Sequence, residues 1–282
     1  MKVLLQDKIV PEEQAVVSVF DRGFLYGDGL FETIRVVNGK MFRWPQHLTR
    51  LQHGADFLKL RLPYPADKMA EWGHELARAN GLSDCLLRVN LSRGVGPRGY
   101  SPRGADRPTL VMTTCPVAEV NPQQPPLWSV VTSTLRLPAG DPLAHFKTSN
   151  KLTQILARSE ADGLGANEAL LLNTNGHVVE ASSGNLFWIQ RQEIWTAGIG
   201  AGILPGVTRE VVFEIARTLG CEVGEAQITP QQLIQVDGVF LTVTSAGIVE
   251  CGSMDGVALR RSPLCRELQT AYRELLVTET QG

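Results

Sequence analysis

Residues 145–156 read HFKTSNKLTQIL and place a lysine just before an expected helix. The Thr-Ser-Asn run at 148–150 consists of residue types that cap helix amino ends, and apolar residues then recur at helical spacing over 152–156. The stretch therefore predicts a helix that begins shortly after Lys147. A second lysine, Lys151, follows. Lys147 is either a solvated surface charge or a side chain held at the mouth of a helix for chemistry.

The composition is that of a globular protein without a strong electrostatic preference. The 282 residues are 43% hydrophobic, which is ample for a large core and two domains. The formal net charge is −2 and the basic residues are dispersed, so neither nucleic acid nor an anionic membrane is expected as a partner. No apolar run approaches the roughly 18 residues of a membrane helix, and Asp7 and Lys8 interrupt the stretch where a signal peptide needs an apolar core.

The cysteines and histidines form no functional pattern. Five cysteines without a CxxC pair indicate reduced thiols in a cytoplasmic protein. The five histidines form no cluster with ligand spacing, so we expect no metal site. Any chemistry is therefore expected to use other side chains.

A proline-rich stretch, EVNPQQPP at 119–126, separates two apolar, strand-like runs. We predict a small amino-terminal α/β domain over 1–120, a linker over 121–133 and a larger carboxy-terminal, cofactor-binding domain over 134–282. Both halves mix strands with helices, so the fold class is α/β (α+β). The expected elements are a hairpin around Asn38-Gly39, helices within 45–60, 66–81 and 206–220, and strands within 85–94, 167–197 and 236–252.

Four local features are compatible with one shared ligand. Glu180 lies at a strand end and is followed by small residues that leave room for a flat molecule. Gly206 precedes a helix start with Thr208 in its first turn, where free N–H groups and the helix dipole favour phosphate. Arg50 can clamp a phosphate, and residues 242–247 offer hydroxyls at a strand end. Each feature alone is more often structural.

Taken together, a lysine, a carboxylate and a phosphate cradle are what pyridoxal 5′-phosphate requires. The lysine amine forms a Schiff base with the aldehyde of the cofactor. The carboxylate keeps the pyridine nitrogen protonated, so that the ring can accept electrons from the substrate. This combination is a hypothesis that the separate features do not establish.

The order of the motifs strengthens this hypothesis. The chain resembles the class IV aminotransferases, the pyridoxal-phosphate enzymes of fold type IV, which include branched-chain aminotransferase, D-amino-acid aminotransferase and aminodeoxychorismate lyase. The motifs appear in family order over roughly residues 20–250. They are YGDGLFETIR (26–35), HLTRL (47–51), RGVGPRGY (93–100), FKTSNKL (146–152), EALLLNTNGHVVEASSGNLFWI (168–189), GILPGVTR (202–209) and TVTSAG (242–247).

The resemblance implies a two-domain enzyme with the cofactor between the domains. It implies a homodimer in which the partner's amino-terminal domain helps to close each pocket. Lys147 would be the Schiff-base lysine and would move the proton at the substrate Cα, and Glu180 would pair with the pyridine nitrogen. Lys151 would be a surface or supporting residue. The implied ligands of the cofactor phosphate and its surroundings are Arg50, Gly206, Val207, Thr208, Thr244 and Ser245.

The substrate residues are less well defined by the resemblance. Phe31 and Thr33 occupy the strand that faces substrate in the family, but Phe31 stands where a D-amino-acid enzyme has tyrosine and Thr33 where the branched-chain branch has glycine. Arg98 and Tyr100 lie where the D-amino-acid branch has an Arg-x-His carboxylate trap, and the whole loop resembles that of the lyases. Arg98 is the candidate for carboxylate binding.

We therefore expect a transaminase that moves an amino group between an amino acid or primary amine and a 2-oxo acid, by ping-pong kinetics through a Lys147 Schiff base. The alternative is an aminodeoxychorismate lyase that releases pyruvate and 4-aminobenzoate, because it needs the same cofactor residues. A catalytically inactive pyridoxal-phosphate-binding protein is a remote third hypothesis. The donor, the acceptor and the stereochemical preference stay open.

Overall fold

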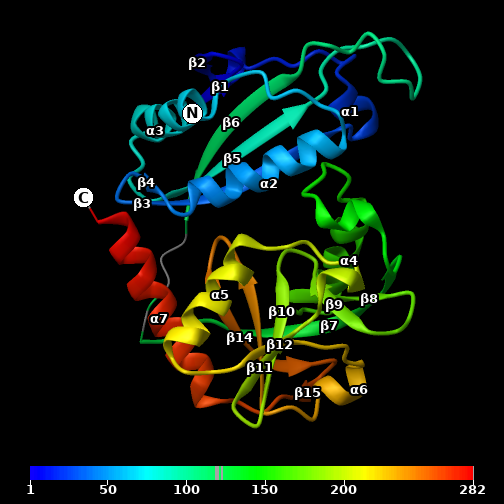
Figure 1. Ribbon diagram of the computed structural model, residues 1–282, viewed down its shortest axis with the longest axis vertical. Coiled ribbons are helices and arrows are strands. Elements are labelled where there is room, and N and C mark those ends of the chain that lie inside the picture. Colours follow the sequence, from blue (N-terminus) through cyan, green and yellow to red (C-terminus); the bar gives the residue numbers. More distant parts are fainter. Residues whose placement is uncertain (118–120, 122, 282) are drawn as a thin grey trace. The chain divides into compact units, whose positions relative to one another are not determined.

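The structure is a computed structural model that describes every residue except 118–120, 122 and 282 (Figure 1). The chain forms two compact units. Unit 1 comprises Met1–Ala118, Phe146–Asn150 and Leu276–Gly282, and unit 2 comprises Glu119–His145 and Lys151–Leu275. Both units mix strands and helices, which confirms the expected α/β class.

The boundaries differ from those expected at 120/121 and 133/134. Residues 120 and 122 lie outside the described part of the chain. Of the expected linker over 121–133, the part from Leu127 onward is already strand, because the apolar run after the last proline pairs with another strand of unit 2. Two short segments of the expected carboxy-terminal domain, Phe146–Asn150 and Leu276–Gly282, belong to unit 1.

Unit 1 is a six-stranded antiparallel sheet covered on one face by two helices (Figure 1). The strand order is β2-β1-β6-β5-β3-β4. Leu51 and Ala55 of α2 and Met69 and Leu76 of α3 share one buried core with the sheet. The elements are β1 (Lys2–Leu5), β2 (Lys8–Pro11), η1 (Glu12–Gln14), α1 (Arg22–Tyr26), β3 (Gly29–Val37), β4 (Lys40–Met41), α2 (Trp44–Phe57), α3 (Ala66–Ala79), β5 (Cys85–Ser92) and β6 (Thr109–Pro116).

The expected hairpin at Asn38-Gly39 is confirmed. Val36 pairs with Met41 and Val37 with Lys40, so a two-residue turn joins β3 to β4. Both turn residues have positive φ, 51° for Asn38 and 75° for Gly39. These are the conformations that a type I′ hairpin turn requires and that Asn-Gly adopts readily.

Strand alternation gives the unit 1 sheet two different faces. Leu30, Ile34 and Val36 of β3 point into the core under the helices. Phe31 and Thr33 therefore point to the opposite face, where the register pairs Thr33 with Arg88 of β5. Phe31 and Thr33, two of the four expected substrate residues, share this second face.

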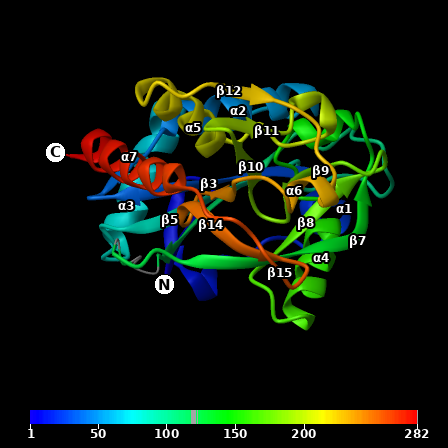
Figure 2. The same cartoon turned by 90° about the horizontal axis from the view of Figure 1, so that it is seen from below.

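Unit 2 is built on a nine-stranded sheet in the order β12-β11-β10-β13-β14-β7-β8-β9, with β15 beside β14. The last strand, β9, also pairs with β10, so the strands from β10 to β9 form a closed ring of pairings. Helix α5 lies beside β12 in both views (Figures 1 and 2). The elements are β7 (Leu127–Leu137), η2 (Pro142–His145), α4 (Leu152–Gly163), β8 (Glu168–Asn173), β9 (Val178–Ala181), β10 (Asn185–Gln190), β11 (Glu193–Thr196), η3 (Ile199–Ala201), α5 (Val207–Thr218), β12 (Val223–Glu225), α6 (Pro230–Leu233), β13 (Gly238–Val243), β14 (Gly247–Met254), β15 (Val257–Ala258) and α7 (Pro263–Thr280), whose last residues belong to unit 1.

The helix expected after Lys147 is α4, but the expected capping is wrong. Lys151 is its N-cap residue, and no side chain caps the helix. Thr148 instead forms a β-bridge with Leu30, and the Asn150 side chain donates to the Gly27 carbonyl at 3.2 Å. These residue types therefore attach the lysine segment to unit 1.

Among the residues that the structure describes, no helix combines the length and the apolar character needed to cross a membrane. Over the same residues, no group of three or more histidine, cysteine or acidic side chains is arranged to hold a metal ion.

Candidate active site

Lys147 is held against β3 by its own backbone. Its carbonyl accepts a hydrogen bond from Phe31 N at 2.9 Å, and Ser149 N donates to the Gly29 carbonyl at 2.9 Å. The Lys147 amine consequently lies 4.6 Å from the centroid of the Phe31 ring. Phe146, the residue before it, stacks on Phe57 at 4.4 Å. Backbone pairing and ring stacking thus restrict both sides of the lysine.

Arg88 shares the Phe31 ring with Lys147. The guanidinium carbon of Arg88 lies 4.0 Å from the ring centroid, and Arg88 Nε donates to the Asn90 side-chain oxygen at 3.0 Å. Sequence reasoning did not select Arg88. The available signal was alternation in CLLRVNLS, where buried Leu87 and Val89 flank an arginine that must point to the opposite face. The Phe31 ring therefore has both an amine and a guanidinium close to it.

Arg50 of α2 is oriented by a buried carboxylate. Arg50 Nε and Nη2 donate to the two oxygens of Glu32 at 2.8 and 2.7 Å. Glu32 is 1% exposed and also lies 2.8 Å from His47 Nδ1. Burial alone raises the pKa of Glu32, but Arg50 and His47 outweigh it and lower the pKa to about 2. The carboxylate is therefore ionised at neutral pH and fixes the guanidinium that the resemblance assigns to phosphate.

His47 is buried in the same cluster. Burial lowers its pKa, and the opposing effect of Glu32 does not overcome burial. The charges of Arg50 and Lys147 lower the pKa further. A neutral ring that carries its proton on Nδ1 can donate to Glu32.

Acid should unfold the protein partly through Glu32. Its pKa is lower in the folded state than in the unfolded state, so its stabilising contribution is complete above about pH 4.5 and is lost as the pH falls toward 2. The contribution is on the order of 3 kcal/mol. We expect Glu32→Gln to lower the free energy of unfolding at neutral pH and to flatten its decline in acid, as measured by urea unfolding across this range.

The matched control for that measurement is Glu71→Gln. Glu71 forms an exposed pair with Lys68, so its loss should change the unfolding curve little at any pH. An acid decline in Glu32→Gln as steep as in the unsubstituted protein would contradict the role given to Glu32.

The loop that carries Arg98 and Tyr100 lies at the surface of unit 1. Both side chains are exposed, and the Arg98 guanidinium makes no hydrogen bond or ion pair with any described residue of the chain. Thr33, half-buried, is the register partner of Arg88. The structure therefore brings Phe31 and Thr33 to the face of Lys147 and leaves the two loop residues in solvent.

In unit 2, Glu180 is fixed by the segment that leads into α5. Its Oε2 accepts from Leu204 N at 3.1 Å, and the Asn185 side chain donates to the Leu204 carbonyl at 2.8 Å. Lys151 is near: burial lowers the pKa of its ammonium, and Glu180 acts in the opposite direction. The carboxylate thus lies beside the start of the helix expected to bind phosphate.

The start of α5 has the features of an anion site. The helix begins at Val207 after Gly206, and no side chain caps it. A Cβ at Gly206 would collide with the Asn185 side-chain oxygen, so a larger residue there would have to displace Asn185. Thr208 is buried in the first turn. Uncapped N–H groups at a helix start, together with the dipole, suit a phosphate.

Thr244 and Ser245 form the tight turn between β13 and β14. Thr244 is half-buried and Ser245 is exposed. Gly247 closes the turn at a φ of 71°, with the Tyr272 ring where a side chain would lie. The buried Thr242 hydroxyl, just before the turn, has no hydrogen-bond partner among the described residues. The turn therefore presents the hydroxyl groups of Thr244 and Ser245 at the end of β13.

A buried carboxylate that sequence reasoning missed supports the turn after Glu180. Glu168 is fully buried and accepts hydrogen bonds from the Ser182 hydroxyl, from the Ser183 hydroxyl at 2.5 Å and from Ala169 N at 2.7 Å. Glu168 thereby holds the Ala-Ser-Ser-Gly turn, in which the small residues leave space next to Glu180. The sequence gives no local signal for this role, because an acidic residue at the start of a strand is ordinary.

The donor set fits pyridoxal phosphate. The cofactor needs an amine, a carboxylate for its pyridine nitrogen and an anion site, and all three are present. Within unit 1 these groups are Lys147 and the oriented Arg50, and within unit 2 they are Glu180, the glycine-led start of α5 and the turn at 244–245.

The chain is similar in sequence and in fold to several known proteins. The model of the amino-transferase class IV family matches residues 29–254. The chain is 36% identical to a Methanocaldococcus jannaschii protein named as a branched-chain-amino-acid aminotransferase, over 98% of this chain and 96% of that one. It is 32% identical to the aminodeoxychorismate lyase of Vibrio harveyi, over 87% and 86%. Among solved structures, the branched-chain aminotransferase of the archaeon Thermoproteus uzoniensis with norvaline aligns with a TM-score of 0.92 and 30% identity, over 100% and 96%.

Proposed function

Since the chain belongs to the class IV aminotransferases, we propose that it transfers an amino group from an amino acid or primary amine to a 2-oxo acid with pyridoxal 5′-phosphate as its cofactor. The observation that carries this proposal is the setting of Lys147, whose backbone pairs with β3 and whose amine lies 4.6 Å from the centroid of the Phe31 ring. A surface lysine is not expected to be restrained in this way.

Each residue has a defined task in this proposal. When bound, pyridoxal phosphate supplies an electrophilic carbon and an electron sink. Lys147 would hold the cofactor covalently and would take and return the proton at the substrate Cα. Glu180 would supply a negative charge for the pyridine nitrogen. The residues that would bind the phosphate group are Arg50, Gly206, Val207, Thr208, Thr244 and Ser245.

We propose that an arginine side chain binds the substrate carboxylate, and two arginines are candidates. Arg88 lies beside Phe31 on the face of Lys147, and Arg98 is exposed on its loop together with Tyr100. A guanidinium forms two parallel hydrogen bonds with a carboxylate, which an ammonium cannot do. Phe31 and Thr33 would line the adjacent space, where they limit the shape of the substrate side chain.

We propose a homodimer, which exposed apolar side chains support. In unit 1, Phe20 and Phe24 are 66% and 74% exposed, and Val16 and Val19 lie exposed in the same stretch. Such a cluster is unusual on a monomer and is typical of an interface. The partner in this proposal is a second copy, and sedimentation as a monomer would contradict it.

We also propose a cytoplasmic location, which the scattered free cysteines support.

Aminodeoxychorismate lyase is the second candidate function. The similarity to a lyase of this type and the glycine-rich loop over 93–100 favour it. The lyase reaction needs the same lysine and the same removal of a proton from Cα, but it expels pyruvate instead of passing on an amino group.

A spectral titration separates the two functions. We expect the purified protein, reconstituted with pyridoxal phosphate, to convert its bound cofactor to the pyridoxamine form when the right amino donor is added. A 2-oxo acid should reverse the change. The donors to test are L- and D-amino acids, a primary amine and aminodeoxychorismate. Pyruvate release from aminodeoxychorismate without an acceptor, and no conversion by any other donor, would make the protein a lyase.

A further inference from the structure

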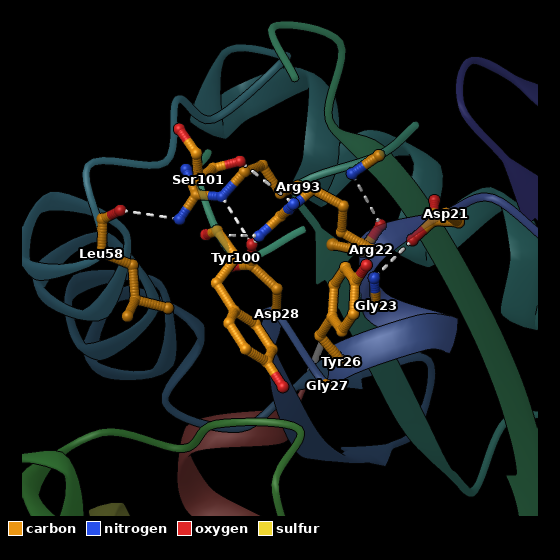
Figure 3. Close-up of polar contacts among 12 residues, drawn as sticks. Asp21, Arg22, Gly23, Tyr26, Gly27, Asp28, Leu58, Arg93, Tyr100 and Ser101 are labelled. Atoms are coloured by element: carbon orange, nitrogen blue, oxygen red, sulfur yellow. Dashed lines mark hydrogen bonds and ion pairs between the residues drawn. The ribbon is translucent and has the colours of Figure 1, made fainter. Parts of the chain in front are cut away.

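Arg22 is buried in unit 1 and binds the loop that carries Arg98. It is the first residue of α1 and is 3% exposed. Arg22 Nη1 donates to the carbonyls of Gly99 at 2.8 Å and Ser101 at 3.2 Å, and Nη2 donates to the carbonyl of Tyr100 at 3.1 Å (Figure 3). Three consecutive carbonyls therefore converge on one guanidinium.

The loop depends on such external contacts. Residues 93–108 join β5 to β6 without a helix or strand. Residues 100–104 are all exposed, Tyr100 by 88%, so this part of the loop has little packing of its own to fix its path. At its start, the Gly94 carbonyl accepts from Arg22 N at 2.9 Å. Arg22 thus contacts the loop with both its backbone and its side chain.

The charge of Arg22 is balanced by Asp28. Arg22 Nε and Arg93 Nε both donate to Asp28 Oδ2 at 2.8 Å (Figure 3). Burial alone raises the pKa of Asp28, but the hydrogen bonds from Arg93 and Arg22 lower it below its usual value. Arg93 also donates to the carbonyls of Leu58 at 2.8 Å and Lys59 at 3.2 Å. The shared carboxylate therefore connects the loop to the end of α2.

Tyr26 adds a second contact to the same loop. Its ring lies 4.9 Å from the Arg22 guanidinium carbon, and its hydroxyl accepts from Gly99 N at 3.2 Å. The ring meets that of Tyr100 edge to face at 5.7 Å (Figure 3). Arg22 and Tyr26 together bind Gly99 through both its carbonyl and its N–H.

We propose that Arg22 is a positioning residue for recognition of the substrate carboxylate. Arg98 is exposed and has no partner among the described residues, so its direction follows from the backbone of its loop. Arg22 fixes that backbone through the carbonyls of 99–101 and does not itself touch substrate. The inference rests on the proposed function, which assigns a substrate carboxylate to Arg98. The planar fork of donors makes arginine, and not lysine, suitable for the task.

Trypsin provides a test that does not need turnover. It can cleave after Arg98 and after Arg103, both in the loop, whereas Pro108 protects the bond after Arg107. We expect the holoenzyme of Arg22→Lys to be cut at Arg98 and Arg103 roughly tenfold faster, because the loop opens more often. Arg43→Lys is the matched control, since Arg43 precedes the start of α2 and donates to Glu279 at 2.6 Å.

Kinetics test whether Arg22 acts through Arg98. Arg22→Lys should raise KM for a carboxylate-bearing donor roughly tenfold and change kcat little, as expected when uniform binding is lost. In an Arg98→Ala background the same substitution should raise KM no further, because the residue it positions is gone. A merely structural role would lower the apparent kcat through the amount of folded protein and would leave KM unchanged.

Tyr26→Phe is a second variant that tests the same proposal if Arg22→Lys does not fold. It removes one hydroxyl, retains the ring beside Arg22 and should speed cleavage at Arg98 a few-fold. Unchanged cleavage in the folded variants, or KM effects of Arg22 and Arg98 that simply multiply, would overturn the role of Arg22. Absence of transamination by the unsubstituted holoenzyme would instead refute the proposed function, and the cleavage comparison would still decide what holds the loop.

Discussion

Lys147→Ala is expected to reduce turnover by roughly 10⁴-fold or more, because one side chain both binds the cofactor covalently and moves the proton at Cα. The variant should also lose the visible absorbance of the covalently bound cofactor. Its fold should survive, because the contacts that hold the segment to β3 are made by the backbone, through the Lys147 carbonyl and Ser149 N. Absorbance and steady-state rate measured on the same preparation check both expectations.

Lys151→Ala is the matched control for Lys147. It removes a second amine from the same stretch, and that amine is partly buried close to Glu180. We expect this variant to retain covalently bound cofactor. If Lys147→Ala retained the absorbance and the turnover while Lys151→Ala lost them, the assignment of the catalytic lysine would be wrong.

Glu180→Gln is expected to slow removal of the Cα proton by roughly 10²-fold or more. Glutamine can still accept the hydrogen bond from Leu204 N, so the local structure and cofactor binding should persist. It carries no negative charge, so it cannot keep the pyridine nitrogen protonated. The rate of the first half-reaction, followed by stopped-flow absorbance with donors bearing hydrogen or deuterium at Cα, measures the effect.

The isotope effect decides how the Glu180→Gln result is interpreted. A slower half-reaction with an equal or larger deuterium effect places the defect in proton removal. Glu193→Gln, at an exposed position of β11, serves as the control and should behave like the unsubstituted protein. An unchanged rate in Glu180→Gln would contradict the pairing of this carboxylate with the pyridine nitrogen.

Elements with local signals were predictable from the sequence. Asn38-Gly39 demands a tight hairpin because both residues adopt positive φ readily. The helix over 206–220 has an apolar face and a glycine stop, and α5 occupies Val207–Thr218 of it. In both cases the interactions that determine the structure lie within one element or its turn.

Features that depend on distant residues were not predictable. Thr148 and Asn150 have the composition of helix caps, yet they bind Leu30 and Gly27, more than a hundred residues earlier. Nothing local in the lysine segment indicates that it belongs to unit 1. The start of β7 at Leu127, within the stretch expected to be a linker, likewise depends on its partner β14.

The candidate site shows the same division. Lys147 and Glu180 were selected by motif, but the residues that orient the site were missed. Glu32 fixes Arg50, and Glu168 fixes the turn after Glu180, through contacts between separate elements. Arg88 was overlooked because an arginine in a strand is ordinary until its neighbour across the sheet is known. Sequence can name reactive side chains, whereas their supports appear only in the folded chain.

Chemical mapping of the covalent lysine tests the central claim most directly. The unsubstituted protein would be reconstituted with pyridoxal phosphate, reduced with borohydride to make the attachment permanent, digested and analysed by mass spectrometry. The account predicts one phosphopyridoxyl group on Lys147, with Lys151 unmodified in the same peptide. Modification of Lys151 or of another lysine, or no modification in a protein that binds the cofactor, would contradict it.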